Sequence, residues 1–150
     1  MPLVPMTAFT EDVKKHKYAV GQFNLNNLEF TQAITEAAIE EKSPVIFGVS
    51  EGALKYMGLE FTVAMAKAAA ERAGVPVALH LDHGSNFDIV MKCIRAGFSS
   101  VMFDGSHHPY EENIRLTKKV VEAAHAVGVS VEGELGTIGG VEDDLSVDEE

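Results

Sequence analysis

The 150-residue chain is short of basic residues, of cysteine and of long apolar stretches. Its 12 Lys and Arg against 23 Asp and Glu give a net charge of −11, which excludes nucleic acid and anionic membranes as expected partners because both need a basic surface. The single cysteine, Cys93, permits no internal disulfide and predicts the reducing cytoplasm. No apolar run reaches the roughly 18 residues of a membrane span, and the start of the chain does not have the pattern of a secretory signal.

What remains is an ordinary globular composition. Hydrophobic residues make up 46% and charged residues 23% of the chain, which argues against disorder. No low-complexity segment or linker divides the sequence, so we expect one domain. The acidic charge does not exclude a phosphorylated small molecule, because a few local donors or a metal ion can bind phosphate.

Short β-rich runs alternate with helical patterns along the chain, with a period of about 25–30 residues that is typical of a βα unit. The predicted strands cover residues 18–23, 45–49, 77–81, 100–103 and 129–135. The predicted helices are one whose apolar stripe is Phe30, Ala33, Ile34, Ala37 and Ala38, ending at Ser43, and three more over residues 61–73, 87–96 and 111–127. Residues 136–150 are predicted to form a loop.

Two architectures fit this alternation, an open doubly wound sheet and a (β/α)₈ barrel. No G-x-G-x-x-G fingerprint of a doubly wound nucleotide site follows the first strand. A barrel predicts chemically useful residues at the carboxyl end of every strand, and these residues are Asn24, Ser50, Glu51, Asp82, His83, Asp104, Glu132 and Glu134. We therefore predict an α/β fold, a TIM barrel of which about the first four βα units plus strand five are present.

The length of the chain limits how much of a barrel it can form. A barrel needs eight units and about 250 residues, so roughly three units, on the order of 100 residues, are expected to be absent. Residues 1–150 would then be the N-terminal part of a single barrel domain. Strands one and five would each expose an unpaired edge.

Asp82 and His83 are the sharpest local signal for chemistry. A neutral imidazole can bind a metal and a neighbouring carboxylate can move a proton, but an ordinary hydrogen-bonded loop pair explains the dipeptide equally well. Carboxylates at Asp104, Glu132 and Glu134 would repel one another unless a cation or a proton lay among them, and a metal ion is the simpler explanation. With His83 they form a mixed nitrogen and oxygen set that suits zinc or another divalent transition ion.

Structural interpretations compete with the metal at several of these positions. Glu132 could face a helix and pair with a base, and His80 is better explained as a satisfied core histidine. For His107 and His108 we favour a role at a helix entry or in a solvated loop, because Pro109 follows them. The glycine-rich and then acidic segment after strand five fits a solvated charge run or a mobile loop that carries a carboxylate acid or base.

Together these motifs resemble, in order and over essentially the whole chain, the class II fructose-1,6-bisphosphate aldolases. The matching segments are A-V-G-Q-F-N (19–24), S-P-V-I (43–46), S-E-G (50–52), H-L-D-H-G (80–84), G-F-S-S-V-M (97–102) with Asp104, V-E-G-E-L-G (131–136) and G-G-V-E-D (139–143). The H-L-D-H-G and E-x-E-L-G pieces are the most specific of them.

The resemblance implies proton-transfer roles for three carboxylates. Asp82 is similar to the acid/base that handles the aldehyde oxygen. Glu142 is similar to the loop carboxylate that removes a proton from dihydroxyacetone phosphate. Glu149 is similar to a second loop acid/base.

The resemblance also implies a set of binding residues. His83 is similar to a ligand of catalytic Zn²⁺, while Asp104 and Glu134 are similar to ligands of a second or alternate divalent position. Asn24 and Ser50 are similar to substrate contacts, Ser50 near the glyceraldehyde 3-phosphate part. A requirement for a monovalent cation belongs to the same family pattern.

The implied reaction is the reversible cleavage of fructose 1,6-bisphosphate, a step of glycolysis and gluconeogenesis, in a cytoplasmic homodimer or homotetramer. The family's two other zinc histidines lie in its second half, so we expect these 150 residues alone to be inactive or nearly so. Three alternatives stay open: a tagatose-1,6-bisphosphate aldolase, a metal-dependent hydrolase on a barrel, and a non-catalytic half-barrel that self-associates through its open edges.

Overall fold

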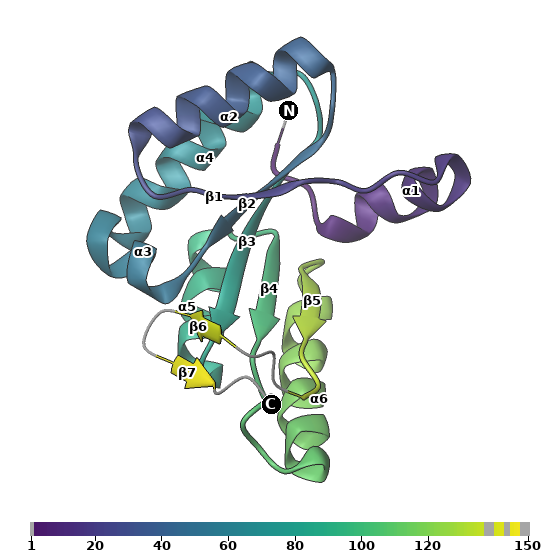
Figure 1. The fold of residues 1–150 in the computed structure, drawn as a ribbon, viewed down its shortest axis with the longest axis vertical. Coiled ribbons are helices and arrows are strands. Elements are labelled where there is room, and N and C mark those ends of the chain that lie inside the picture. Colours follow the sequence, from purple (N-terminus) through teal and green to yellow (C-terminus); the bar gives the residue numbers. More distant parts are fainter. Residues whose placement is uncertain (1, 137–139, 143–144, 148–150) are drawn as a thin grey trace.

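Five parallel strands form the centre of the molecule (Figure 1). The computed structural model describes residues 2–136, 140–142 and 145–147. The strands are β1 (Gln22–Asn24), β2 (Val45–Val49), β3 (Val77–Gly84), β4 (Ser100–Phe103) and β5 (Ser130–Gly133). They lie side by side in the order in which they occur along the chain. A doubly wound sheet reverses direction at a switch point, so this sequential order confirms the prediction of a barrel-type fold.

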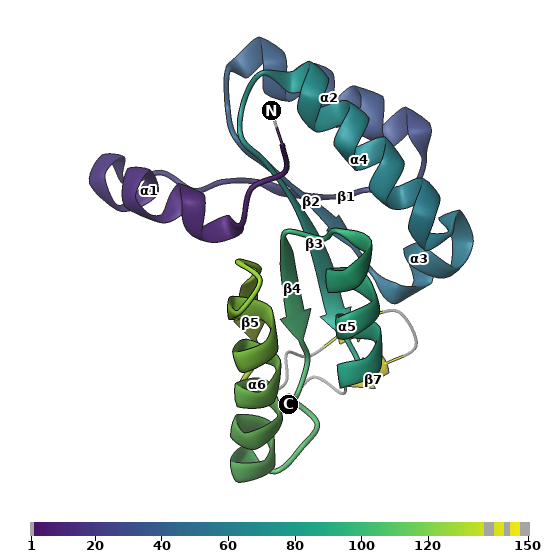
Figure 2. The same ribbon diagram turned by 180° about the vertical axis from the view of Figure 1, so that it is seen from behind.

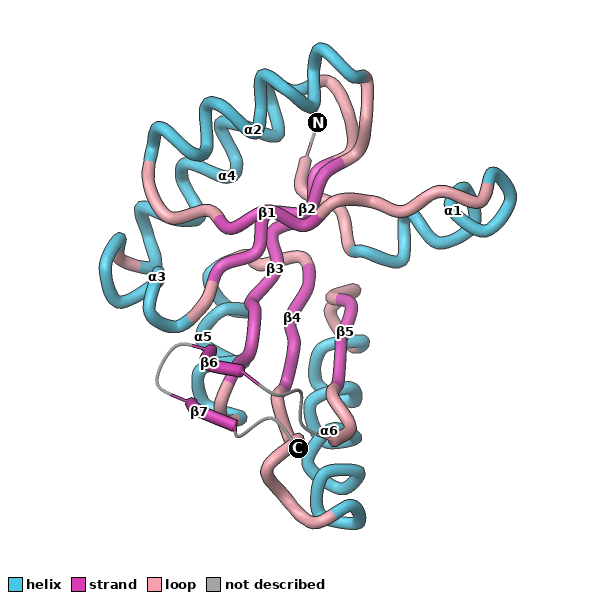
Figure 3. Tube along the Cα trace, in the orientation of Figure 1, coloured by secondary structure: helices cyan, strands magenta, loops and turns pink. Residues whose placement is uncertain are grey.

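Helices connect the strands and cover one face of the sheet (Figures 1 and 2). They are α2 (Leu28–Glu41), α3 (Glu51–Met57), α4 (Leu59–Ala73), α5 (Phe87–Ala96) and α6 (Tyr110–His125), preceded by the 3₁₀ turn η1 (Met6–Phe9) and by α1 (Thr10–His16). A small antiparallel hairpin, β6 (Gly140–Glu142) and β7 (Leu145–Val147), follows β5 (Figure 3). In the described part of the chain, no helix has the length and apolar character that crossing a bilayer requires.

The two faces of the sheet have different cores. On the helix side, the buried side chains of Phe47, Leu79 and Val101 belong to the main apolar cluster. On the other face, Ile46 and Ala78 form a smaller cluster with residues of the N-terminal segment. That segment is tied to the amino ends of the strands, because the N–H of Val4 donates to the carbonyl of Val77 and the N–H of Met6 donates to Ser130 Oγ. The N-terminal segment therefore leaves the carboxyl ends of the strands, at the opposite end of the sheet, uncovered.

The predicted elements agree with the structure best where the local signal is strong. Residues 45–49, 100–103 and 87–96 form the predicted strands and helix with the predicted bounds. The first predicted strand, residues 18–23, begins four residues before β1. The strand predicted over residues 77–81 ends three residues before β3 does. The segments η1 and α1, and the hairpin in the predicted final loop, were not predicted. Neither was α3, which begins after Ser50 because the Ser50 hydroxyl accepts a hydrogen bond from the N–H of Ala53 at 3.3 Å.

The apolar stripe predicted for the first long helix was wrong in part. Phe30 is half exposed, and Thr31 and Thr35 are buried in its place together with Ala38. Each of these threonine hydroxyls donates to the carbonyl four residues earlier. Because this bond satisfies the hydroxyl locally, threonine can occupy the buried face of the helix.

We expect Gly84→Ala to lower the free energy of unfolding by about 1–3 kcal/mol, as overpacking of a filled site does. A methyl group at this position would lie 2.6 Å from the carbonyl oxygen of Met102, which is backbone and cannot rotate away. Urea denaturation measures the effect. Gly133→Ala is the matched control, since its nearest neighbour is the side chain of Thr117 at 3.3 Å. Equal stability of the two variants would contradict the packing argument.

Candidate functional site

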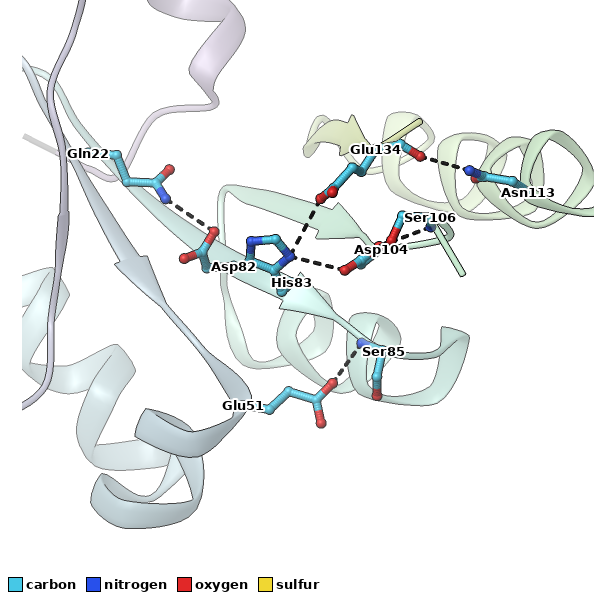
Figure 4. A network of polar contacts seen from close by, with 9 residues as sticks. All are labelled: Gln22, Glu51, Asp82, His83, Ser85, Asp104, Ser106, Asn113 and Glu134. Carbon is cyan, nitrogen blue, oxygen red and sulfur yellow. Dashed lines mark hydrogen bonds and ion pairs between the residues drawn. The ribbon is translucent and has the colours of Figure 1, made fainter. Parts of the chain in front are cut away.

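His83 lies where β3 leaves the regular sheet. Its φ of 48° is in the left-handed region, and the pairing of β3 with β4 shifts register between Leu81 and Gly84. Neighbouring side chains of a regular strand point to opposite faces, so this irregularity is what turns the imidazole toward the ends of β4 and β5. His83 Nδ1 lies 3.1 Å from Asp104 Oδ2 and 3.6 Å from Glu134 Oε2 (Figure 4).

Asp104 follows the last residue of β4 and is buried. Its Oδ1 accepts hydrogen bonds from the N–H of Ser106 at 3.0 Å and from the Ser106 hydroxyl at 2.6 Å, which leaves Oδ2 to face His83. Burial raises the pKa of Asp104, but the hydrogen bonds from Ser106 and the neighbouring His83 together outweigh it and lower the pKa below its ordinary value. The carboxylate is therefore ionised at neutral pH.

Glu134 is held in place through its backbone. Buried Asn113 of α6 donates from Nδ2 to the carbonyl of Glu134 at 2.7 Å, and Thr117 donates its hydroxyl to Asn113 Oδ1 at 3.0 Å. The bond from Asn113 restrains the main chain of Glu134, and the Glu134 carboxylate faces His83. Asn113 was not predicted from the sequence, where its signal is a polar residue on the helix face that also carries Val120 and Ala124.

His83, Asp104 and Glu134 form a cluster whose ligand atoms all lie within 4.8 Å of one another; we call these three residues the metal cluster. Ligands about 2.1 Å from a tetrahedral Zn²⁺ ion lie about 3.4 Å apart. The two distances measured from His83, 3.1 and 3.6 Å, lie on either side of that value. One imidazole and two carboxylates thus suit a divalent ion chemically, and the two distances from His83 are compatible with a shared ion.

Asp82 lies beside this cluster but points elsewhere. Its Oδ1 accepts a hydrogen bond from Gln22 Nε2 of β1 at 3.2 Å (Figure 4). Asn24 ends β1 and is exposed, while the Ser50 hydroxyl caps α3. The structure thus places the predicted residues Asn24, Ser50, Asp82 and His83 at the carboxyl ends of neighbouring strands.

Two predicted loop acids cannot be located in this arrangement. Glu142 is the last residue of β6, and its side chain is outside the described part of the structure. Glu149 lies outside the described residues altogether.

Glu132 does not join the metal cluster. Its Oε2 lies 3.2 Å from Nε2 of His80, although the oxygen is not aligned for a hydrogen bond to that nitrogen. Nδ1 of the fully buried His80 contacts Ser100 Oγ at 2.8 Å. The adjacent His80 lowers the pKa of Glu132 despite its partial burial. The interpretation in which Glu132 faces a helix and pairs with a base was right in placing a basic residue beside it and wrong about the helix, because His80 lies on the sheet face that carries Ile46 and Ala78, away from the helices.

Glu51 supports the same turn of β3 from the neighbouring strand end. Its Oε1 accepts a hydrogen bond from the N–H of Ser85 at 2.7 Å, two residues beyond His83. The sequence predicts Glu51 at a strand end but does not predict this partner. His107 and His108 lie in the loop before α6 with their ring centroids 4.1 Å apart, outside the metal cluster.

Comparison with known proteins identifies the family. Residues 4–150 match the model of the family described as fructose-bisphosphate aldolase class-II. The chain belongs to this family. It is 65% identical over 148 residues to the probable fructose-bisphosphate aldolase of Bacillus subtilis (strain 168) and 60% identical over 148 residues to the fructose-bisphosphate aldolase of Geobacillus stearothermophilus.

Both matches cover 97% of the chain and 52% of the relative, so this class-II aldolase chain spans about half the length of the curated relatives it matches. The crystal structure of the YdjI aldolase from Escherichia coli K12 superposes with a TM-score of 0.83 at 38% identity, covering 89% of this chain and 52% of that one. The predicted family is confirmed.

We expect the metal cluster to bind a divalent ion in solution. Co²⁺, a spectroscopic substitute for Zn²⁺, should give d–d absorption bands on titration, and His83→Gln should weaken binding at least about tenfold because it removes one of three protein ligands. The double variant His107→Gln/His108→Gln is the control, since these rings lie outside the cluster. A His83→Gln chain that binds Co²⁺ as tightly as the parent chain would show that the site is misassigned.

Proposed function

We propose that the protein to which this chain belongs is a zinc-dependent lyase that cleaves fructose 1,6-bisphosphate reversibly into dihydroxyacetone phosphate and glyceraldehyde 3-phosphate. The observation that carries the proposal is the metal cluster of His83, Asp104 and Glu134, which lies beside Asp82 at the carboxyl ends of the strands. In barrel enzymes this end of the sheet carries the active site. The relatives at 57–65% identity are named fructose-bisphosphate aldolases, which supports the choice of substrate.

The metal cluster would hold Zn²⁺, which when bound supplies Lewis-acid polarisation of a carbonyl oxygen. Asp82 is next to His83 in the chain but faces away from the cluster, so its carboxyl group can exchange a proton without serving as a ligand. In this assignment Asp82 handles the proton at the aldehyde oxygen and Glu142 removes the proton from dihydroxyacetone phosphate, so that two separate carboxyl groups divide the two transfers.

The remaining residues at the strand ends would bind substrate. Asn24 is exposed at the end of β1, where its amide can contact a sugar hydroxyl. Ser50 lies at the start of α3, and we assign it to the glyceraldehyde 3-phosphate part of the substrate. None of the five strands of the described sheet ends in a lysine that could form a Schiff base with the ketone.

The complete site is proposed to need residues beyond this 150-residue chain. The metal cluster supplies one imidazole, and the family resemblance assigns further zinc histidines to the other half of the barrel. We assign the active protein to the cytoplasm as a homodimer or homotetramer. Comparing cleavage rates on the fructose and tagatose bisphosphates, in a protein of the relatives' length, separates the two sugar specificities.

Asp82→Asn should lower kcat for aldol cleavage by about 10²–10⁴-fold in a protein of the relatives' length, because the amide fills the same space but cannot transfer the proton. Asp88→Asn is the control, since Asp88 is an exposed carboxylate on α5. A steady-state assay coupled to the triose phosphate product measures both. An Asp82→Asn enzyme with the kcat of the parent would remove Asp82 from the mechanism.

Chelation should abolish the same activity, and added Zn²⁺ should restore it. The ligands of the ion, which include the imidazole of His83, must be deprotonated to bind it. Dialysis against a chelator followed by metal titration of the cleavage rate is the measurement. Full activity in the chelated protein, with metal analysis confirming that the ion is gone, would contradict a zinc-dependent reaction.

A further inference from the structure

Gln22 of β1 contacts Asp82 of β3 across the strand that separates them. Its Nε2 lies 3.2 Å from Asp82 Oδ1, and Figure 4 shows the two side chains pointing toward each other. In the sheet, Gln22 lies opposite Ile46, and Ile46 lies opposite Ala78. The Gln22 side chain therefore crosses β2 and leans toward the carboxyl end of the sheet to reach a residue further along β3.

Gly48 of β2 leaves the space that this crossing needs. A Cβ atom at position 48 would lie 2.9 Å from Nε2 and 3.0 Å from Cγ of Gln22. The glutamine side chain therefore lies along the backbone of Gly48, on the sheet face that is not covered by the helices. Any larger residue at position 48 would displace the amide from its path to Asp82.

The contact also has a defined chemical direction. The amide NH₂ of glutamine only donates, and an ionised carboxylate only accepts. The torsion that turns a carboxylate about its last bond is broad and weakly restrained, so a donor fixed on one oxygen sets the direction of the other. A proton-transfer group needs such support, because a misplaced acid or base loses much of its effect.

We propose that Gln22 is a positioning residue for Asp82, and that Gly48, which has no side chain, provides the space in which the Gln22 side chain lies. The contact itself follows from the geometry of β1, β2 and β3. Its effect on catalysis rests on the proposed function, in which Asp82 is the acid/base. Gln22 itself needs no contact with substrate or metal in this role.

The contact can be tested without any enzymatic assay. The chain contains two glutamines, Gln22 and Gln32, so glutamine-selective ¹⁵N labelling gives two side-chain NH₂ groups in an NMR spectrum. Asp82→Asn should shift the Gln22 NH₂ resonances and leave those of Gln32, which is exposed on α2, unchanged. Resonances of Gln22 that do not respond to Asp82→Asn would overturn the proposal.

The functional consequence is tested by a double-mutant cycle in a protein of the relatives' length. Gln22→Leu keeps a side chain of similar size without the donor, and should lower kcat about tenfold while KM changes by less than about twofold. In the Asp82→Asn background, the same substitution should cause no further loss, because it acts through Asp82. Gln32→Leu is the control and should leave kcat unchanged.

Two further variants separate positioning from folding. Gln22→Glu keeps the shape but sets a second carboxylate against Asp82, so it should lower kcat more than Gln22→Leu does. Gly48→Ala leaves Gln22 intact and obstructs its path, so it should lower kcat in the same direction. Equal losses from Gln22→Leu in both backgrounds, or no loss at all, would overturn the positioning role.

The results also distinguish this proposal from the proposed function. A protein without aldolase activity whose Gln22 resonances respond to Asp82→Asn would retain the contact and refute the assigned reaction. An active aldolase in which Gln22 responds to neither test would keep the reaction and refute the role of Gln22.

Discussion

The break at the end of β3 determines which groups can meet at the carboxyl end of the sheet. A regular strand would send Asp82 and His83 to opposite faces. The positive φ of His83 and the close packing of Gly84 against the Met102 carbonyl end that alternation. His83 then faces Asp104 and Glu134, while Asp82 faces β1. A metal ligand and a proton-transfer group can therefore be consecutive residues and still serve separate tasks.

Each acidic side chain around this break lies beside a particular polar group. Of the acidic side chains on β5 and just after it, Glu132 lies beside buried His80, and Glu134 faces His83. Asp104 is kept ionised by the Ser106 hydrogen bonds. The metal cluster thus contains two carboxylates and one imidazole, a set that a divalent cation and neutral histidine would balance without net charge. Had Glu132 also faced the cluster, a third carboxylate would have repelled the other two.

The sequence could predict much of what depends on neighbours along the chain. Buried strands such as Val45–Val49, and the carboxyl ends that follow them, were found from continuous apolar runs. The identities of the site residues came mostly from the family resemblance. What could not be predicted depends on distant residues: the Gln22 contact spans 60 positions and the Glu51 contact 34. Ser50 shows the opposite case, since its helix cap is local and the pattern was missed.

The network of Figure 4 extends from one edge of the sheet to the other. Gln22 is on β1, a strand of three residues, and Glu134 follows β5. Both are edge strands of the described sheet, so within that sheet each of these strands is paired on one side only. In a closed barrel the edges are paired and these strands would be held from both sides. How exactly Asp82 and the metal cluster are positioned should therefore depend on the strands that pair with β1 and β5. The chemistry at the carboxyl ends of the strands is in this way coupled to completion of the barrel.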